Sequence, residues 1–472
     1  MNADDAKQYR KMILTPPGRL IFTLAVPTVI SMLTTMIYNL VDSYFVGKLG
    51  TSASAAVGIV MSVQAVFQAF GFMYGQGSGS MIARFLASGK KQEADRTLTT
   101  GLAGACLTGL LLAAAGLIAI RPLMYIMGST DTIYPFARTY AFFILLSGPA
   151  LAMSCVLNNV MRYEGRAFFA MFGLVSGGVL NMIMDPILMF GLGLGITGAA
   201  LSTMISQYVS FAILLYMFLS GKTISNIKLS VLKTTPAPAV LSSAVKIIRT
   251  GLPSLIRQLF GALSTMTLNL CAKPYGDAAI AAMTIDGRVL MLIASSMIGI
   301  GQGFQPVSAF NYGSKKYSRV RRAAFVTWRA GTIIMSLVAL AVFTHPTEII
   351  RLFRDDPEVV RFGVPALRFM CVAAVIQPVS VVANMLLQSV GESTKASILS
   401  SLRSGLCYIP FLLILPHFIG FTGIQCSQMC ADILSSLISV PFLISFFGKL
   451  PAEDEHTARD DEYVRFAGED GD

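Results

Sequence analysis

Four acidic residues stand inside long apolar stretches of the chain: Asp42, Asp185, Asp286 and Asp432. The other acids lie in the terminal segments or in polar connections. An ionisable side chain in hydrocarbon is costly, so it usually faces a polar interior and takes part in function. These four residues are therefore the first candidates for chemistry.

Asp42 lies in the segment IYNLVDSYF. On a helix, Thr35 and Tyr38 share its face at one-turn spacing, and Asn39 lies alongside. Asp185 follows Asn181 by four residues, which also places these two on one face. Pro186 removes a backbone donor directly after Asp185 and frees carbonyl groups to coordinate a cation.

Two carboxylates with amide and hydroxyl oxygens form the hard-oxygen set that Na⁺ prefers. They can equally share a proton, because like charge and poor solvation both favour the neutral carboxyl group. The structural alternative is that each Asp reaches the membrane interface or is satisfied by the backbone.

Asp286 permits two interpretations. Arg288 is two residues away and cannot face it on a helix, whereas Arg257 on the preceding apolar stretch can. A structural ion pair with Arg257 therefore competes with a substrate site or a second proton site. Asp432 is interpreted as structural.

Pro27 shares a stretch with Asp42, and a proline inside a helix bends it, so we expect Pro27 to act as a hinge. Adaptable methionines suit varied apolar ligands. The candidates for lining a substrate cavity are Thr35, Tyr38, Asn39, Met61, Gln64, Arg257, Met283, Asp286 and Met291.

The elements that position these residues must lie in a membrane. The chain has 472 residues, of which 54% are hydrophobic and 13% charged, and charge gathers in its two terminal segments. A water-soluble fold could not cover its surface at that density. This composition excludes a soluble enzyme, a nucleic-acid-binding protein and a disordered scaffold.

Twelve apolar stretches reach the roughly 20 residues that a spanning helix needs. They are residues 20–46, 54–84, 97–120, 132–160, 167–190, 197–220, 245–272, 279–311, 321–344, 359–388, 397–418 and 422–447. Because lipid cannot satisfy loose backbone groups and no barrel-type alternation is present, all twelve should be helices.

Basic residues set the orientation. With a cytoplasmic N-terminus, the cytoplasmic side carries 23 Lys and Arg and the opposite loops carry seven. The net charge of +11 is thus a topology signal rather than a nucleic-acid patch. We expect a multi-pass protein of the cell inner membrane with both termini in the cytoplasm.

The two halves of the chain repeat at an offset of 226 residues. Pro27 corresponds to Pro253, Gly50 to Gly276, Asn158 to Asn384 and Gly165 to Gly391, and Thr197 meets Thr422 at 225. Six helices per half make the repeats parallel, with a V-shaped cavity between them, which is a transporter's plan.

The predicted organisation is an N-terminal segment 1–19, a first lobe 20–221, a linker 222–244, a second lobe 245–448 and an acidic tail 449–472, mostly disordered. The same offset takes Asp42 to Leu268 and Asp185 to Phe411. The polar set was not duplicated, so the first lobe should handle the ion.

No enzyme motif is convincing. A phosphate-binding Walker loop is absent, and the GxSxG match at 75–79 lies in an apolar stretch without a histidine partner. The seven cysteines form no CxxC pair and are expected to be inert thiols. We expect no enzymatic activity and no cofactor.

The opening VPTVISMLTTMIYNLVDSYFVGKLG, the repeated GQG and the turn Glu164 to Arg166 resemble the multidrug and toxic compound extrusion (MATE) family over residues 15–448. The likeness is closest to its DinF-like and MepA-like bacterial branch. The resemblance implies a cation or proton site in the first lobe at Asp42, Asn181, Asp185 and Thr203. Another branch keeps an acid in the helix corresponding to 245–272, which this chain lacks.

We therefore expect a monomeric twelve-helix antiporter that exports cationic, amphipathic drugs across the lipid bilayer in exchange for H⁺ or Na⁺. The alternative is a flippase for lipid-linked oligosaccharide or lipid of the same superfamily. A membrane enzyme or receptor finds no supporting constellation.

Overall fold

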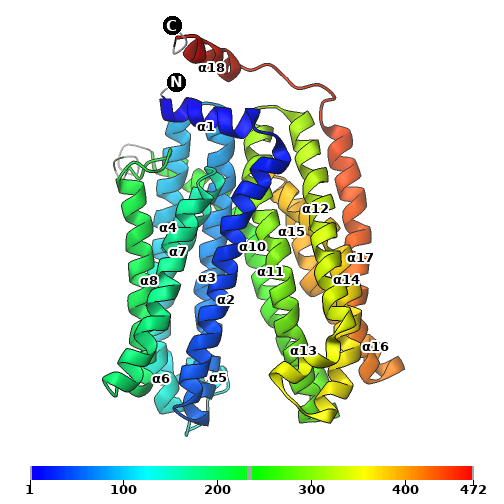
Figure 1. Ribbon diagram of the computed structural model, residues 1–472. Coiled ribbons are helices and arrows are strands. Elements are labelled where there is room, and N and C mark those ends of the chain that lie inside the picture. Colours follow the sequence, from blue (N-terminus) through cyan, green and yellow to red (C-terminus); the bar gives the residue numbers. More distant parts are fainter. Residues whose placement is uncertain (1–2, 229, 231–235, 470–472) are drawn as a thin grey trace. The chain divides into compact units, whose positions relative to one another are not determined.

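The computed structural model describes residues 3–228, 230 and 236–469, and the elements assigned in these residues are all helices (Figure 1). Twelve helical segments of the described chain are long and apolar enough to cross a membrane. The predicted all-α membrane fold with twelve spans is therefore confirmed.

The six spans of the first repeat are joined by short connections. They are α2 (Pro17–Gly47), α3 (Thr51–Ala87), α4 (Lys91–Ile118), α6 (Tyr134–Tyr163), α7 (Ala167–Pro186) with the π-helix η1 (Ile187–Gly191), and α8 (Gly195–Leu219). The shorter helices α1 (Ala3–Leu14) and α5 (Ile120–Ile126) accompany them.

The six spans of the second repeat follow the same order. They are α10 (Ala237–Ala272) with η2 (Lys273–Tyr275), α11 (Asp277–Gly313), α12 (Tyr317–Thr344), α14 (Pro357–Val390), the segment α15 (Ser393–Ser401), η3 (Leu402–Leu406) and α16 (Tyr408–Ile419), and α17 (Phe421–Lys449). The short helices α13 (Pro346–Phe353) and α18 (Ala458–Glu469) complete the chain.

The repeat is visible in individual contacts. The Asn158 amide donates to the Ala170 carbonyl at 2.8 Å, and the Asn384 amide donates to the Ala396 carbonyl at 2.7 Å. Gly50 and Gly276 precede α3 and α11 with φ of 113° and 91°, which L side chains rarely adopt. The predicted offset of 226 residues thus relates equivalent positions in three dimensions.

The described chain forms two compact units whose boundaries fall inside helices. One unit holds the residues up to Gln8 and Ile30–Gly251, and the other begins with Tyr9–Val29 and resumes at Leu252. The first part of α10 packs in the first unit, where a Cβ on Gly251 would lie 1.8 Å from the Met73 carbonyl oxygen. The first part of α2 packs in the second unit, where a Cβ on Gly303 would lie 2.6 Å from the Ala25 nitrogen. The boundary in α2 lies two residues after Pro27.

Two buried carboxylates hold the start of the linker against the first repeat. Glu164 accepts hydrogen bonds from the backbone nitrogens of Ile224 and Ser225, both at 2.9 Å. Asp95 accepts from the Asn226 nitrogen at 2.8 Å and pairs with Lys228 at 2.7 Å. The linker therefore leaves α8 along a defined path before it reaches residues outside the described range.

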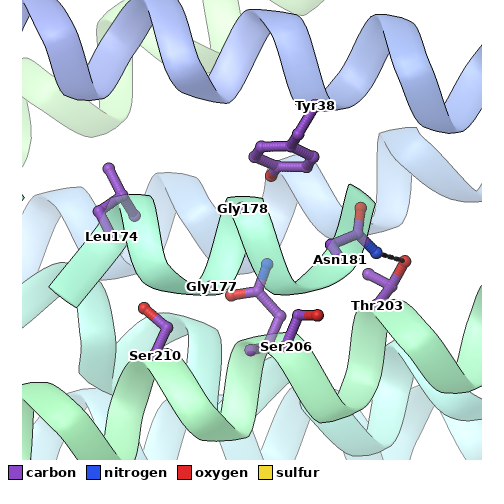
Figure 2. Close-up of a pocket in the computed structure, with 9 residues that line it drawn as sticks. Tyr38, Leu174, Gly177, Gly178, Asn181, Thr203, Ser206 and Ser210 are labelled. Atoms are coloured by element: carbon purple, nitrogen blue, oxygen red, sulfur yellow. Dashed lines mark hydrogen bonds between the residues drawn. The ribbon is translucent and has the colours of Figure 1, made fainter. Parts of the chain in front are cut away.

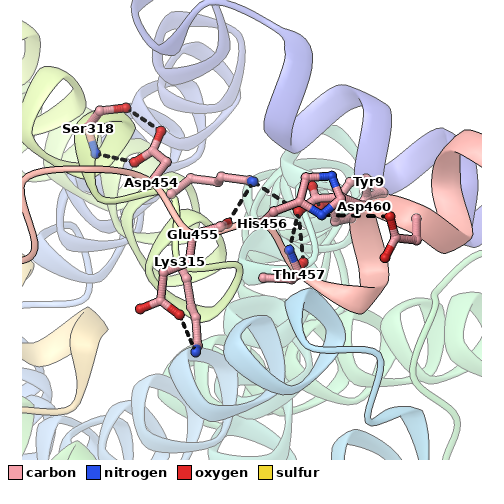
Figure 3. A network of polar contacts seen from close by, with 10 residues as sticks. Tyr9, Lys315, Ser318, Asp454, Glu455, His456, Thr457 and Asp460 are labelled. Atoms are coloured by element: carbon pink, nitrogen blue, oxygen red, sulfur yellow. Dashed lines mark hydrogen bonds and ion pairs between the residues drawn. The ribbon is translucent and has the colours of Figure 1, made fainter.

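The acidic tail is more ordered than its composition predicts. Beyond α17, Asp460 accepts from the Tyr9 hydroxyl at 2.5 Å and from Lys316 at 2.9 Å (Figure 3). Burial alone would raise the pKa of Asp460, but the hydrogen bonds from Tyr9, Lys316 and Thr457 lower it to about 2. The expectation of a mostly disordered tail is wrong for the described residues, because these contacts fix α18.

Candidate cation-binding site

Asp42 from α2 and Asp185 from α7 meet inside the first repeat. Their exposed fractions are 5% and 0%. The two carboxyl groups lie close enough to share a hydrogen bond when one is protonated. No cationic side chain of the described residues is paired with either one. A buried carboxylate pair without a positive partner is unstable unless it acquires protons or a cation.

Asn181 connects this pair to α8. Its amide nitrogen lies 3.2 Å from Asp185 Oδ1, 3.0 Å from Ser202 Oγ and 3.4 Å from Thr203 Oγ1. The Ser202 hydroxyl in turn donates to the Asn181 carbonyl at 3.3 Å. The structure thus brings together Asp42, Asn181, Asp185 and Thr203, which are the four residues that the family resemblance implied.

Three oxygens of this cluster have no hydrogen-bond partner among the described residues: Asp42 Oδ1, Asp185 Oδ2 and Asn181 Oδ1. All three are buried acceptors, and leaving such groups unpaired costs free energy. Unpaired carboxylate and amide oxygens fit a small hard cation or protons, and they do not fit an anion.

Pro186 explains why the helix changes form beside Asp185. Proline lacks a backbone donor and its ring crowds the preceding turn. The α-helix accordingly ends at Pro186, and the π-helix Ile187–Gly191 follows. Single-turn π segments frequently mark functional sites. The predicted loosening of the helix at this point takes the form of that π-helix.

Sequence reasoning missed two neighbours of the pair. Ser202 bonds to Asn181, and Tyr140 of α6 lies within hydrogen-bonding reach of Thr203 and close to both carboxyl groups. Ser202 has a signal in the repeat of serines four residues apart along α8 at 202, 206 and 210. Tyr140 has none, because its contact with the site joins distant parts of the chain.

The neighbours predicted on the Asp42 face have separate roles. Tyr38 lines a small pocket together with Asn181 and Thr203 (Figure 2). The Thr35 hydroxyl donates to the Ser31 carbonyl at 2.9 Å, so its own helix satisfies it. Asn39 is half-buried.

The remaining cavity candidates differ in exposure. Met61 and Gln64 on α3 are half-buried, and Met61 packs against the apolar core of the first repeat. On α11, Met283 is 7% exposed, whereas Met291 is 62% exposed. Arg257 on α10 is half-buried.

The two acids of the second repeat have opposite surroundings. Both carboxylate oxygens of Asp286 lack a hydrogen-bond partner among the described residues, so the suggested ion pair with Arg257 is not formed. The two side chains come from different helices, and a one-face argument cannot fix their distance. Asp432 pairs with Arg403 at 2.8 Å, which agrees with its structural interpretation.

Comparison with known proteins places this geometry in a family. The model of the MatE family matches residues 27–187 and 253–414, one match in each repeat. The chain is 26% identical to the multidrug export protein MepA of Staphylococcus saprophyticus over 417 residues, 88% of this chain and 91% of that protein.

Solved structures agree. The chain superimposes on MATE in the straight conformation with a TM-score of 0.88 and 26% identity, covering 95% of this chain and 99% of that one. For MATE in the bent conformation the TM-score is 0.87 at 25% identity, with coverage of 95% and 99%. The chain is a multi-pass membrane protein and not an enzyme, and it belongs to the MatE family of transporters.

Proposed function

We propose that this protein is a secondary antiporter that exports cationic, amphipathic compounds in exchange for H⁺ or Na⁺. The observation that carries the proposal is the buried Asp42–Asp185 pair, which has unpaired oxygens and no cationic partner among the described residues. The similarity to a multidrug export protein supports the choice of cargo.

The coupling ion binds at Asp42, Asn181, Asp185 and Thr203. In the ionised state the pair carries uncompensated negative charge in a poorly solvated interior, which favours a conformation open to an incoming cation. Uptake of H⁺ or Na⁺ from outside removes that charge. The neutralised pair then allows α2 and α7 to pack more closely, and the drug leaves.

Pro27 is the hinge of this proposal. It interrupts α2 two residues before the point where that helix passes from one compact unit to the other. A bend there moves the segment that carries Asp42 while the start of α2 stays with the second-repeat helices. The similarity to MATE in both straight and bent conformations supports a movement of this kind.

The available energy suffices for export. One charge moving down a potential of 100 mV releases about 2.3 kcal/mol, which sustains a gradient of roughly fifty-fold for a neutral solute. Both termini are assigned to the cytoplasm, because the basic residues gather on that side. We assign the functional unit as a monomer.

Reconstituted vesicles test the proposal. Ethidium efflux is measured under an imposed H⁺ gradient and, separately, under an imposed Na⁺ gradient. One of the two gradients should drive efflux by the wild type, and Asp42→Asn should abolish that efflux without loss of folded protein. Asp277→Asn, the same change at an exposed acid on α11, is the matched control and should keep wild-type efflux. Gradient-driven efflux by Asp42→Asn at the wild-type rate would refute the assigned site.

A further inference from the structure

Serines on α8 bond to carbonyl groups on α7 in a regular antiparallel register. Ser210 Oγ donates to the Gly173 carbonyl at 2.9 Å, and Ser202 Oγ donates to the Asn181 carbonyl at 3.3 Å. Each step of four residues along α8 thus matches four residues backward along α7. By this register, Ser206 should bond to the Gly177 carbonyl.

Ser206 does not make that bond. Its hydroxyl has no partner among the described residues, although the side chain is only 4% exposed. The helices are in close contact here, because a Cβ on Gly177 would lie 3.0 Å from the Ser206 carbonyl oxygen. The unused Ser206 hydroxyl is therefore not the result of loose packing.

The Ser206 hydroxyl lies instead on the wall of a pocket between α2, α7 and α8, which we call the α7–α8 pocket (Figure 2). Asn181, whose Oδ1 is also unpaired, lines the same pocket together with Tyr38 and Gln207. The pocket has a volume of about 20 Å³, which suits one water molecule and is far too small for a drug. Two buried, unpaired oxygens are the partners that such a water requires.

The α7–α8 pocket extends in one direction from the candidate cation-binding site. It shares Asn181 and Thr203 with that site and runs along α8 to Ser210 and along α7 back to Leu174. Seven residues of helix span about 10 Å. This direction leads toward the end of α8 at Leu219 and the beginning of α7, which is the end assigned to the cytoplasm.

The second repeat closes the equivalent place. The repeat offset relates Gly177 to Arg403 and Gln207 to Asp432, and these two form an ion pair at 2.8 Å. Ser206 corresponds to Ala431. The fold is therefore compatible with a filled position here, and the first repeat alone leaves it open and polar.

We propose that the α7–α8 pocket is the cytoplasmic half of the coupling-ion path, with one water molecule held by Ser206 Oγ and Asn181 Oδ1. This proposal rests on the proposed antiport function. When H⁺ is the coupling ion, the water accepts a proton from the carboxyl pair and passes one of its own protons toward the cytoplasm. When Na⁺ is the coupling ion, the water begins to rebuild its hydration shell.

Two variants of Ser206 test the path. Ser206→Val fills the pocket and removes the hydroxyl, and Ser206→Ala removes the hydroxyl alone. Ser176→Val is the matched control, since Ser176 lies on α7 one residue from Gly177, is exposed and bonds to its own helix at 2.7 Å. Ion-driven ethidium efflux from vesicles should fall at least tenfold in Ser206→Val and about fivefold in Ser206→Ala. Equilibrium ethidium binding should stay within twofold in both, and Ser176→Val should match the wild type in both measurements.

Radiolytic hydroxyl labelling read by mass spectrometry supplies a measurement that does not depend on transport. A water in the pocket should mark Leu174 in the wild type, and the mark should fall at least fivefold in Ser206→Val but persist in Ser176→Val. An unmarked Leu174 in the wild type, or full efflux by Ser206→Val, would overturn the path while leaving the antiporter proposal intact. A wild type without any ion-driven efflux would overturn both proposals. If Ser206→Val does not fold, full efflux by Ser206→Ala overturns the path by itself.

Discussion

Asp42→Asn should make the protein more stable while it stops transport. The substitution keeps the shape of the side chain and removes one of two buried negative charges. A functional site commonly holds a destabilised arrangement that a mutation relieves at the expense of activity. A residue kept only for architecture would show the opposite change in stability.

The size of the effect follows from the buried pair. Two unit charges about 4 Å apart repel by about 4 kcal/mol at an effective dielectric constant near 20. The unfolding entropy of a chain of this length is about 1 kcal/mol per kelvin. Removing the repulsion should therefore raise the melting temperature by about 4 °C when both carboxyl groups are ionised. The new amide can also donate to Asp185 Oδ2, which has no partner among the described residues.

Thermal unfolding of purified protein in detergent is the assay. At pH 9 without Na⁺, Asp42→Asn should melt about 4 °C above the wild type. Supplying the coupling ion, as H⁺ at pH 5 or as Na⁺ at pH 9, should raise the wild type alone and close the gap, because only the wild type gains by neutralisation. Asp277→Asn should stay within about 1 °C of the wild type throughout. A lower melting temperature for Asp42→Asn at pH 9 would refute the reasoning, since it would mean that Asp42 is satisfied by its surroundings.

Two further predictions concern the second repeat and the tail. Asp432→Asn leaves the guanidinium of Arg403, which is 21% exposed, without its partner, and breaking such a pair costs about 3–5 kcal/mol, so the melting temperature should fall by several degrees; an unchanged value would contradict a structural role. Asp460 has a pKa of about 2, below its ordinary 3.8, so its contribution to tail docking is complete above about pH 4 and is lost as the pH falls through 2. At pH 7, Asp460→Asn should therefore speed amide hydrogen exchange in residues 459–464, and wild-type exchange rates in that variant would show that Lys316 and Tyr9 do not hold the tail through this carboxylate.

The sequence predicts the membrane architecture well because its signals are local. Twelve apolar runs, the 226-residue repeat and the bias of Lys and Arg each arise from one-dimensional patterns. The pair Asn181 and Asp185 is likewise readable from four-residue spacing. The meeting of Asp42 with Asp185 follows less directly, because nothing in either segment sets the distance between α2 and α7, and the family resemblance brought them together.

The remaining features depend on tertiary packing. Tyr140 approaches Thr203 across two helices, and the ion pair of Arg403 with Asp432 joins η3 to α17. Ser206 has the same residue type and spacing as Ser202 and Ser210, yet it alone of the three has no printed partner in the described structure. Only the three-dimensional register between α7 and α8 separates it from its neighbours. The exchange of the first parts of α2 and α10 between the two compact units is invisible in the apolar pattern for the same reason.

The most direct measurement is ion-induced release of a bound drug. Ethidium is first bound to protein in lipid nanodiscs, and then H⁺ or Na⁺ is added while the bound fraction is followed by fluorescence anisotropy. Occupation of the carboxylate pair should displace ethidium from the wild type with a saturable dependence on one of these ions, and Asp185→Asn should retain ethidium at every ion concentration. Equal displacement from the wild type and from Asp185→Asn would contradict the claim that ion binding at this pair controls the cargo.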